Sequence, residues 1–147
     1  MYKHILIPTD GSPIAEKAVA AGVEFAREAH AKVTLFTAVP EYDVPGEGQA
    51  MAHKVISMAE HARRSEQKAN EVLAPAAAKA RAAKLEFRTH YAQCNRPWEA
   101  IVAAARVHGC DAIVMGSHGR KGLSRLMHGS QTIDVLTHSN LPTLVVR

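Results

Sequence analysis

Glycine, hydroxyl and basic side chains are concentrated in residues 116–130, GSHGRKGLSRLMHGS, directly after the apolar run AIVM. Gly116 and Gly119 flank two residues at the end of that run, and Gly129 follows nine residues later. Glycine lets the backbone approach a ligand closely and adopt positive φ angles. The spacing is therefore typical of two backbone turns that could hold one ligand between them.

The residues after Gly129 predict the start of a helix. Ser130 suits a helix cap, and QTIDVLTH has the apolar spacing of a short helix. The backbone N–H groups of Ser130, Gln131 and Thr132 would point out of its N-terminus, where the helix dipole favours a phosphate. Capping and phosphate contact use the same geometry at Ser130, so the two roles are compatible.

The elements expected around this stretch alternate between strand and helix. Short apolar runs predict strands at 3–10, 31–39, 85–92, 111–116 and 141–146. Helical patterns separate them. This order predicts one α/β domain over residues 1–147, with a five-stranded parallel sheet covered by helices on both faces.

The first helix is expected to begin at Asp10-Gly11-Ser12-Pro13, with Ser12 as its cap and Pro13 in its first turn. The apolar residues that recur at helical spacing, and that we expect to face the sheet, are Ile14, Ala18, Ala21, Gly22 and Phe25.

The middle of the chain is rich in helix-forming residues from about 51 to 83, and Pro75 is expected to kink or split that helix. The glycine, proline and acidic content of 41–49 predicts a loop before it. Pro97 opens the next helix, on which Trp98 and Ile101 share one face with Val102 and Ala105, and Gly109 ends it.

The ends of the strands are where an open α/β sheet binds ligands, at the point where the winding reverses. The first strand ends in Pro8-Thr9-Asp10, the second in Thr37-Ala38-Val39 and the fourth in Met115-Gly116. If the sheet reverses between the first and fourth strands, Asp10 and Gly116 lie on opposite sides of one crevice. Alone, Asp10 in Asp-Gly-Ser-Pro is typical of a turn, and its place opposite the glycine-rich stretch favours a binding role.

Composition and charge exclude several classes of protein. The pI is 9.3, but residues 54–84 carry seven basic and three acidic residues, an excess that equals the whole net charge of +4. A helix with a basic face is typical of solvated surface, so nucleic-acid binding is not expected. No apolar run is long enough to span a membrane, and the N-terminus lacks the pattern of a signal peptide. Cys94 and Cys110 fit a reduced, cytoplasmic location.

Other nucleotide and catalytic motifs do not match. The order Arg120-Lys121-Gly122 cannot complete a P-loop, no G-x-G-x-x-G follows the first strand, and Ser117 is not in a G-x-S-x-G elbow. The nine histidines lack the spacing of zinc ligands. No nucleophile or acid is placed to form a relay with His118, for which loop packing or ribose contact is expected instead of catalysis.

The pattern G-x2-G-x9-G-[ST], completed by Ser130, resembles the nucleotide-binding signature of the universal stress protein family. ILIPTDGS at 5–12 is similar to the family's first strand and binding aspartate, and residues 115–147 resemble its C-terminal third, so the resemblance covers nearly the entire chain. It implies a Rossmann-like, adenine nucleotide alpha hydrolase-like domain with strand order 3-2-1-4-5. It further implies ATP binding, because members with the complete glycine pattern are generally ATP binders.

The resemblance also implies residue roles. Asp10, after Pro8 and Thr9, would contact the adenosine portion, and Ala38 would meet the adenine through its backbone. Met115 and Gly116 would border the base and ribose. The residues that would surround the phosphates are Gly119, Gly129, Ser130, Gln131 and Thr132. Gln131 departs from the family, in which small apolar residues such as valine are common at this position, so its longer side chain could alter the phosphate geometry.

The expected function is that of an ATP-binding, stress-response regulator rather than an enzyme. Arg120, Lys121 and Arg125 either neutralise phosphates or are solvated loop charges. Mg²⁺ carried in with ATP would rely on phosphate oxygens and water rather than protein side chains. The family commonly dimerises through its last strand, and the apolar run Leu141–Val146 agrees with a homodimer. Slow ATP hydrolysis and a nucleotide-free interaction dimer remain alternatives, and the sequence does not distinguish ATP from ADP, AMP or a cyclic nucleotide.

Overall fold

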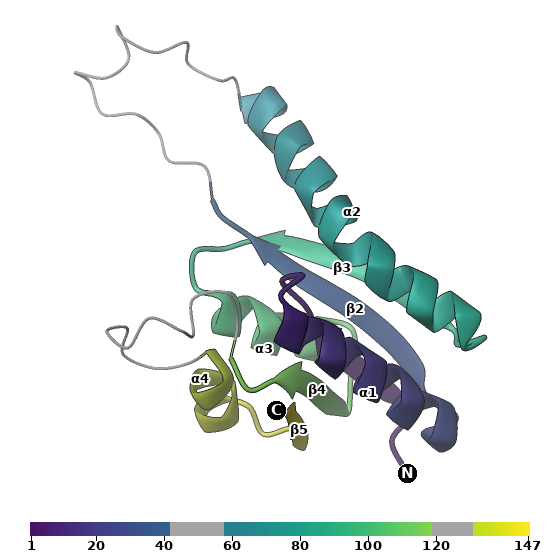
Figure 1. The fold of residues 1–147 in the computed structure, drawn as a ribbon. Helices are drawn as coiled ribbons and strands as arrows, with labels where there is room; N and C mark the ends of the chain where they lie inside the picture. The colour runs from purple at the N-terminus through teal and green to yellow at the C-terminus, as the bar shows by residue number, and fades with distance from the viewer. Residues whose placement is uncertain (42–57, 119–130) are drawn as a thin grey trace, which may run out of the picture.

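Five parallel strands form one sheet in the order β3-β2-β1-β4-β5, as the 3-2-1-4-5 prediction requires (Figure 1). The structure is a computed structural model that describes residues 1–41, 58–118 and 131–147. Strands and helices alternate along the chain as β1 His4–Pro8, α1 Pro13–Ala29, β2 Lys32–Val39, α2 Met58–Ala82, β3 Phe87–Gln93, α3 Pro97–Val107, β4 Ala112–Gly116, α4 Gln131–His138 and β5 Thr143–Val146.

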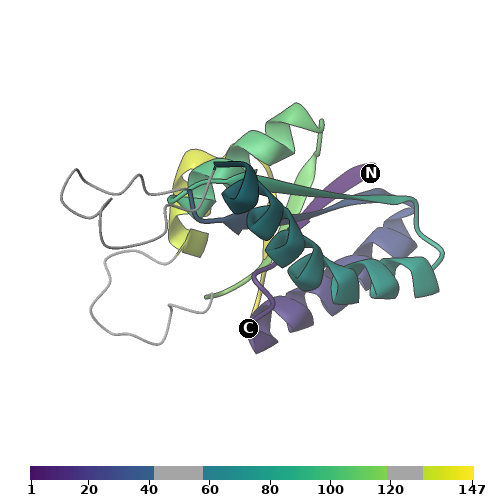
Figure 2. The same ribbon diagram turned by 90° about the horizontal axis from the view of Figure 1, so that it is seen from above.

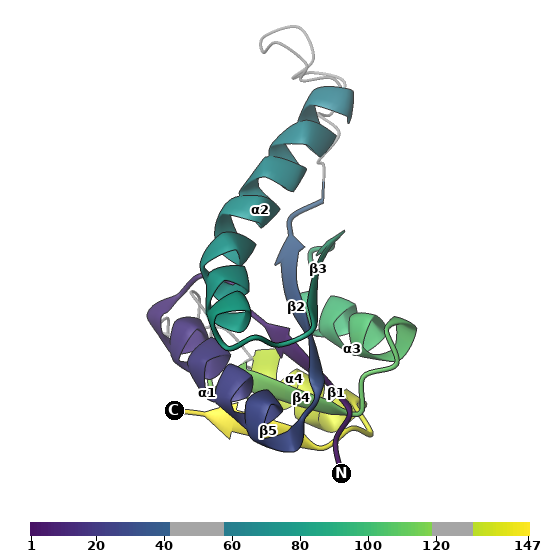
Figure 3. The ribbon, with the colours of Figure 1, turned by 90° about the vertical axis from the view of Figure 1, so that its right-hand side faces the viewer.

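The helices cover both faces of the sheet. Helices α1 and α2 lie on one face and α3 and α4 on the other (Figures 2 and 3). The first two crossovers lead from β1 outward to β3, and the next two lead from β3 back to β4 and β5. A right-handed crossover places its helix on opposite faces for these two directions. The reversal between β1 and β4 therefore sets the two-sided architecture.

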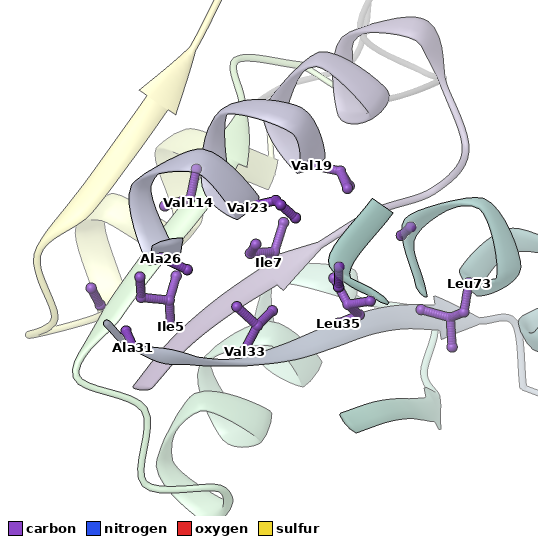
Figure 4. Close-up of a cluster of buried hydrophobic side chains, with 13 residues drawn as sticks. Ile5, Ile7, Val19, Val23, Ala26, Ala31, Val33, Leu35, Leu73 and Val114 are labelled. Atoms are coloured by element: carbon purple, nitrogen blue, oxygen red, sulfur yellow. The ribbon is translucent and has the colours of Figure 1, made fainter. Parts of the chain in front are cut away.

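Alternate residues of the central strands build two separate cores. Ile5, Ile7, Val33 and Leu35 point toward α1 and α2, and Figure 4 shows them packed against Val19, Val23, Ala26 and Leu73. The residues between them on the strands, including Leu6 and Phe36, pack against α3 and α4. Successive side chains of a strand point to opposite faces, so a continuous apolar run such as HILIP serves both cores.

Helix α1 begins as expected but buries a different face. The Ser12 side chain accepts a hydrogen bond from the Ala15 N–H at 3.3 Å, which confirms the cap, and Pro13 lies in the first turn. Of the five residues expected to face the sheet, Ala18 and Gly22 are buried, while Ile14, Ala21 and Phe25 are half-buried, with Phe25 packed against the first core and Ile14 close to Gly116 of β4. The buried stripe is instead completed by Ala15, Val19, Val23 and Ala26. Two apolar stripes overlap in this alanine-rich helix, and packing against the sheet selects one of them.

Gly22 allows α1 to lie close to the sheet. A Cβ atom at this position would lie 2.6 Å from Cδ1 of Ile7 and 3.3 Å from Cβ of Val114. Ile7 and Val114 are fully buried, so neither side chain has free space to move into. A side chain at position 22 would therefore push α1 away from β1 and β4.

Helix α2 continues through Pro75 from Met58 to Ala82, so of the two expected outcomes, a kink or a split, the split does not occur. The helix changes direction along its length, as the views in Figures 1 and 3 agree. Neighbouring apolar contacts hold both halves, since Leu73 and Ala76 on either side of Pro75 are buried against the sheet. Neither α2 nor any other helix in the described ranges is long and apolar enough to cross a membrane.

Both cysteines are free thiols, as expected. Cys110 is buried beneath α3, and this burial raises its pKa to about 11. The thiolate is the reactive form of cysteine, so Cys110 acts as a small apolar packing residue at neutral pH.

Candidate functional site

The sheet opens between β1 and β4 at its carboxyl end. The paired residues of these two strands stop at Leu6 and Ile113. On the far sides, β1 stays paired with β2 through Pro8 and Phe36, and β4 stays paired with β5 through Gly116 and Val146. Beyond Leu6 the two strands therefore belong to diverging halves of the sheet. This is the position predicted for the crevice, at the point where the winding reverses.

The turn after β1 is built by its own polar side chains. The Thr9 hydroxyl accepts a hydrogen bond from the Gly11 N–H at 3.2 Å, and Oδ1 of Asp10 accepts one from the Ser12 N–H at 2.9 Å. Gly11 has a φ angle of 75°, which favours glycine. The turn interpretation of Asp10 is thus correct, and the same contact fixes its carboxylate at the carboxyl end of β1.

Ala38 presents backbone groups beside this turn. In a parallel ladder, every second residue of a strand directs both its N–H and its C=O to the same neighbouring strand. The Phe36 carbonyl accepts from the Thr9 N–H at 2.8 Å, whereas the Val39 carbonyl accepts from Cys94 on the side of β3. Ala38 shares the orientation of Phe36, so its backbone groups point toward β1 at a level beyond the last residue of that strand.

The start of α4 is tied to the end of β4 by Thr132. Its hydroxyl donates to the Gly116 carbonyl at 2.8 Å, and its side chain is buried. Gly116 itself lies close to α1, because a Cβ atom there would lie 3.3 Å from the Ile14 carbonyl oxygen. Thr132 therefore holds the N-terminus of α4 next to the opening of the sheet.

The side chain of Gln131 contacts the neighbouring helix α3. Its side-chain oxygen accepts a hydrogen bond from the Trp98 N–H at 2.7 Å, at the start of α3. Arg96, the cap residue of α3, pairs with the Glu99 carboxylate, but its side chain makes no capping hydrogen bond. Gln131 thus supplies the acceptor that the first turn of α3 lacks. The long side chain that departs from the family pattern points at α3 in this structure.

Trp98 continues the contact between the two helices. Its ring stacks on the His138 ring with centroids 4.3 Å apart, and the Arg96 guanidinium lies 5.3 Å from the Trp98 centroid. Trp98 is half-buried and packs against the second core, in agreement with its expected core role. Sequence reasoning missed the link to Gln131, and no local signal could have found it, because the two residues are 33 positions apart.

Met115 and His118, two further residues of the predicted site, lie in different surroundings. Met115 is buried in the second core, so only its backbone can border a ligand. His118 is exposed, and its Nδ1 lies 3.1 Å from the Ser117 hydroxyl. The predicted site residues outside the described part of the chain are Gly119, Arg120, Gly129 and Ser130, together with the loop charges Lys121 and Arg125.

A hollow of about 350 Å³ lies beside the turn after β1, between α1 and α2. Thr9, Gly11 and Glu16 form one side of it, and α2 contributes Lys68 and Glu71 among other residues. It shares only Thr9 with the predicted site. Among the residues that the structure describes, no three His, Cys, Asp or Glu side chains are grouped so that they could hold a metal ion.

These features define a Rossmann-like α/β protein whose sheet opens at the switch point beside an ordered turn and a helix N-terminus. The model of the universal stress protein family matches residues 1–147. The chain therefore belongs to the universal stress protein family, as the sequence pattern predicted. The universal stress protein MJ0531 of Methanocaldococcus jannaschii is 30% identical over 152 aligned residues, which span all of this chain and 83% of the relative.

Solved structures share the fold. The structure of MJ0577 from M. jannaschii has a TM-score of 0.76 and 28% identity, and the match covers 99% of this chain and 96% of that one. A universal stress protein in complex with cAMP has a TM-score of 0.71, with 22% identity and coverage of 99% and 97%. The protein from Archaeoglobus fulgidus in complex with dAMP has a TM-score of 0.69, with 23% identity and coverage of 99% and 98%.

Proposed function

We propose that this protein binds ATP at the carboxyl ends of β1, β2 and β4 and acts as a nucleotide-dependent regulator in the stress response. The observation that carries the proposal is the opening of the sheet between β1 and β4, with the Asp10 turn on one side and the start of α4 on the other. An open α/β sheet binds ligands at this position.

The ligand class follows from the groups that surround the opening. The N–H and C=O of Ala38 point beyond the end of β1, and a purine carries donors and acceptors that match a backbone edge. Asp10 is placed to accept from ribose hydroxyls, and the N-terminus of α4 favours phosphate. Related proteins of this fold hold cAMP and dAMP, which supports an adenine nucleotide as the ligand.

The proposed role is binding rather than turnover. No nucleophile or general base is identified in the sequence pattern near His118, whose described partner is the Ser117 hydroxyl. Mg²⁺ would enter with ATP and be held by phosphate oxygens and water. A regulator of this kind works through a difference in ATP affinity between two states of the protein, which a partner can detect. We place it in the cytoplasm, where its free thiols would stay reduced.

The proposed regulator is a homodimer joined through β5. This strand lies at the edge of the sheet, and Leu144 remains 46% exposed on it. Ile133 and Leu136 of α4, the helix that precedes β5 in the chain, are also more than half exposed. A second β5 would cover both the apolar side chains and the unpaired backbone groups of the edge.

Calorimetric titration with ATP tests the proposal, and Asp10→Asn is the most informative variant. Asparagine retains an oxygen that can accept from the Ser12 N–H, so the turn survives while the carboxylate is lost. We expect wild type to bind ATP and Asp10→Asn to bind at least ten-fold more weakly with unchanged stability. Glu28→Ala, which removes an exposed carboxylate from α1, is the matched control and should bind like wild type.

The other outcomes distinguish the alternatives. Absence of wild-type binding to ATP, ADP, AMP and cAMP would contradict the proposal and favour the nucleotide-free dimer. The double variant Gly129→Val/Ser130→Ala should lose binding if the predicted phosphate turn is correct. Phosphate release above background by wild type, abolished in both variants, would instead indicate an ATPase.

A further inference from the structure

Three histidines lie on the side of the sheet that α3 covers, and only His4 among them lies at the amino end of a strand. His4 begins β1, His90 is in β3 and His108 follows the last turn of α3. The rings of His90 and His108 meet edge to face with centroids 4.6 Å apart, and His90 also stacks on the buried Phe36 at 5.8 Å. His4 is only 3% exposed, and its Nε2 lies 2.8 Å from the Thr34 hydroxyl.

Two ring nitrogens of this cluster are buried without a hydrogen-bond partner, namely Nδ1 of His4 and Nε2 of His108. A neutral histidine tolerates one such nitrogen, because it carries a proton on only one side of the ring. An imidazolium has N–H groups on both sides and would leave a charged donor buried and unsatisfied. The packing therefore accepts the neutral rings and disfavours the protonated ones.

The charged groups around the cluster also disfavour protonation of the rings. Lys32 at the start of β2 and Arg88 on β3 are the cations whose charge acts on His4, and Arg88 also acts on His108. The facing groups from the segment before β4 are the neutral thiol of Cys110 and the carboxylate of Asp111. Burial, followed by Lys32, Arg88 and His108, lowers the pKa of His4 from the ordinary value of 6.5, and Asp111 only partly opposes this effect. Burial, followed by His90 and Arg88, lowers the pKa of His108.

We propose that His4, His90 and His108 form an acid-sensitive latch, which holds the C-terminal end of α3 against the sheet and loosens when His4 and His108 acquire protons. His108 lies at the helix end, and Cys110, two residues after it, is buried beneath α3. Repulsion between protonated His108 and Arg88 separates this helix end from the edge strand β3. The face of the sheet that carries α1 and α2 contains none of these groups.

The direction of the pH effect follows from linkage. Below pH 6.5 the unfolded or locally opened chain takes up protons that the closed cluster excludes, so the latch is fully stabilising above 6.5 and weakens as pH falls toward the lowered pKa values. Each excluded proton reduces the closed-to-open ratio by up to about ten-fold per pH unit. Asp111 titrates in a separate window. Burial would raise its pKa, but hydrogen bonds from the Lys3 and His4 N–H groups bring it below 3.8.

Hydrogen exchange followed by mass spectrometry tests the latch in the whole protein. Between pH 7.5 and 5.5, after correction for intrinsic exchange rates, we expect α3 and β3 to lose at least ten-fold in protection while α1 changes little. Equal loss in α1 and α3, or no loss in α3, would overturn the proposal. The chain need not bind a nucleotide for this experiment, so its outcome is independent of the proposed function.

Two variants and a control identify the histidines responsible. The urea midpoint of wild type should fall between pH 7.5 and 5.5, and it should fall less in His4→Gln and in His108→Gln. His30→Asn is the control, because His30 is exposed at the end of α1 with φ 53°, a conformation that asparagine tolerates. An equal fall in wild type and both variants would overturn the proposal. If a variant does not fold, NMR titration of the wild-type rings decides, and pKa values of 6.5 or above for His4 and His108 would contradict the latch.

Discussion

Gln131 and Thr132, the first two residues of α4, hold the helix through side chains that act in different directions. Thr132 donates to the Gly116 carbonyl at the end of β4, and Gln131 accepts from the Trp98 N–H at the start of α3. Both bonds join elements that are distant in sequence. The sequence pattern identified these positions only as backbone donors, because side-chain contacts across 16 or 33 residues have no local signature.

The Gln131 contact predicts a loss of stability in Gln131→Ala. The change removes the acceptor that caps α3, which typically costs about 1 kcal/mol, and it should alter the fluorescence of Trp98, the single tryptophan of the chain. Urea unfolding followed by this fluorescence and by circular dichroism measures both effects. Gln67→Ala is the matched control, since Gln67 bonds only to the exposed Glu71 one turn along α2. Equal stability of the two variants would show that the contact does not cap α3.

At the scale of elements, the close approach of α1 to β1 and β4 depends on Gly22, whereas Pro75 is accommodated within α2. Both residues weaken a helix by intrinsic propensity, and tertiary contacts decide the outcome in each case. The strands and helices were predictable because their apolar residues repeat at characteristic spacings. The buried stripe of α1 was not, because alanine-rich faces differ too little in hydrophobicity to select one orientation.

We expect Gly22→Ala to destabilise the protein although alanine is the better helix former. The added Cβ would lie 2.6 Å from Cδ1 of Ile7, and overpacking of this kind typically costs about 1–3 kcal/mol. The double variant Gly22→Ala/Ile7→Val removes the clashing Cδ1 and should recover part of the loss. Thermal unfolding of the three variants, including Ile7→Val alone, measures the interaction. Simple additivity of the two single changes would contradict a steric conflict between these residues.

At the scale of the molecule, the reversal of winding places three features at different positions on one sheet. The opening between β1 and β4 lies at the carboxyl end, the histidine cluster lies on the face that α3 covers, and the exposed Leu144 lies on the edge strand β5. Helix α3 reaches from the histidine cluster at its C-terminal end to Gln131 at its N-terminal end. A single helix, α3, therefore connects the proposed latch with the start of α4 at the proposed binding site.

The proposed dimer predicts that Val145→Pro yields a monomer. Bonds from Ile113 to Pro142 and from Ser117 to Val146 show that even-numbered residues of β5 direct their backbone groups to β4. Val145 therefore directs its N–H outward, and proline removes this donor without removing one used by β4. Light scattering measures the oligomeric state, and Val145→Thr, which keeps the N–H, is the control. A wild-type monomer would contradict the dimer, and a dimeric Val145→Pro would contradict its formation through the β5 edge.

The sequence by itself determined the order of strands and helices, the cap at Ser12, the likeness to a family and the glycine pattern of its binding signature. These features depend on local spacing and on residues close together in the chain. Only the tertiary structure decided which stripe of α1 is buried, where β1 and β4 part, what Gln131 contacts and that His90 and His108 meet. Each of these features depends on packing between segments that are distant in the chain. The geometry of the whole sheet decides the energy of that packing, and no periodic pattern in the sequence reports it.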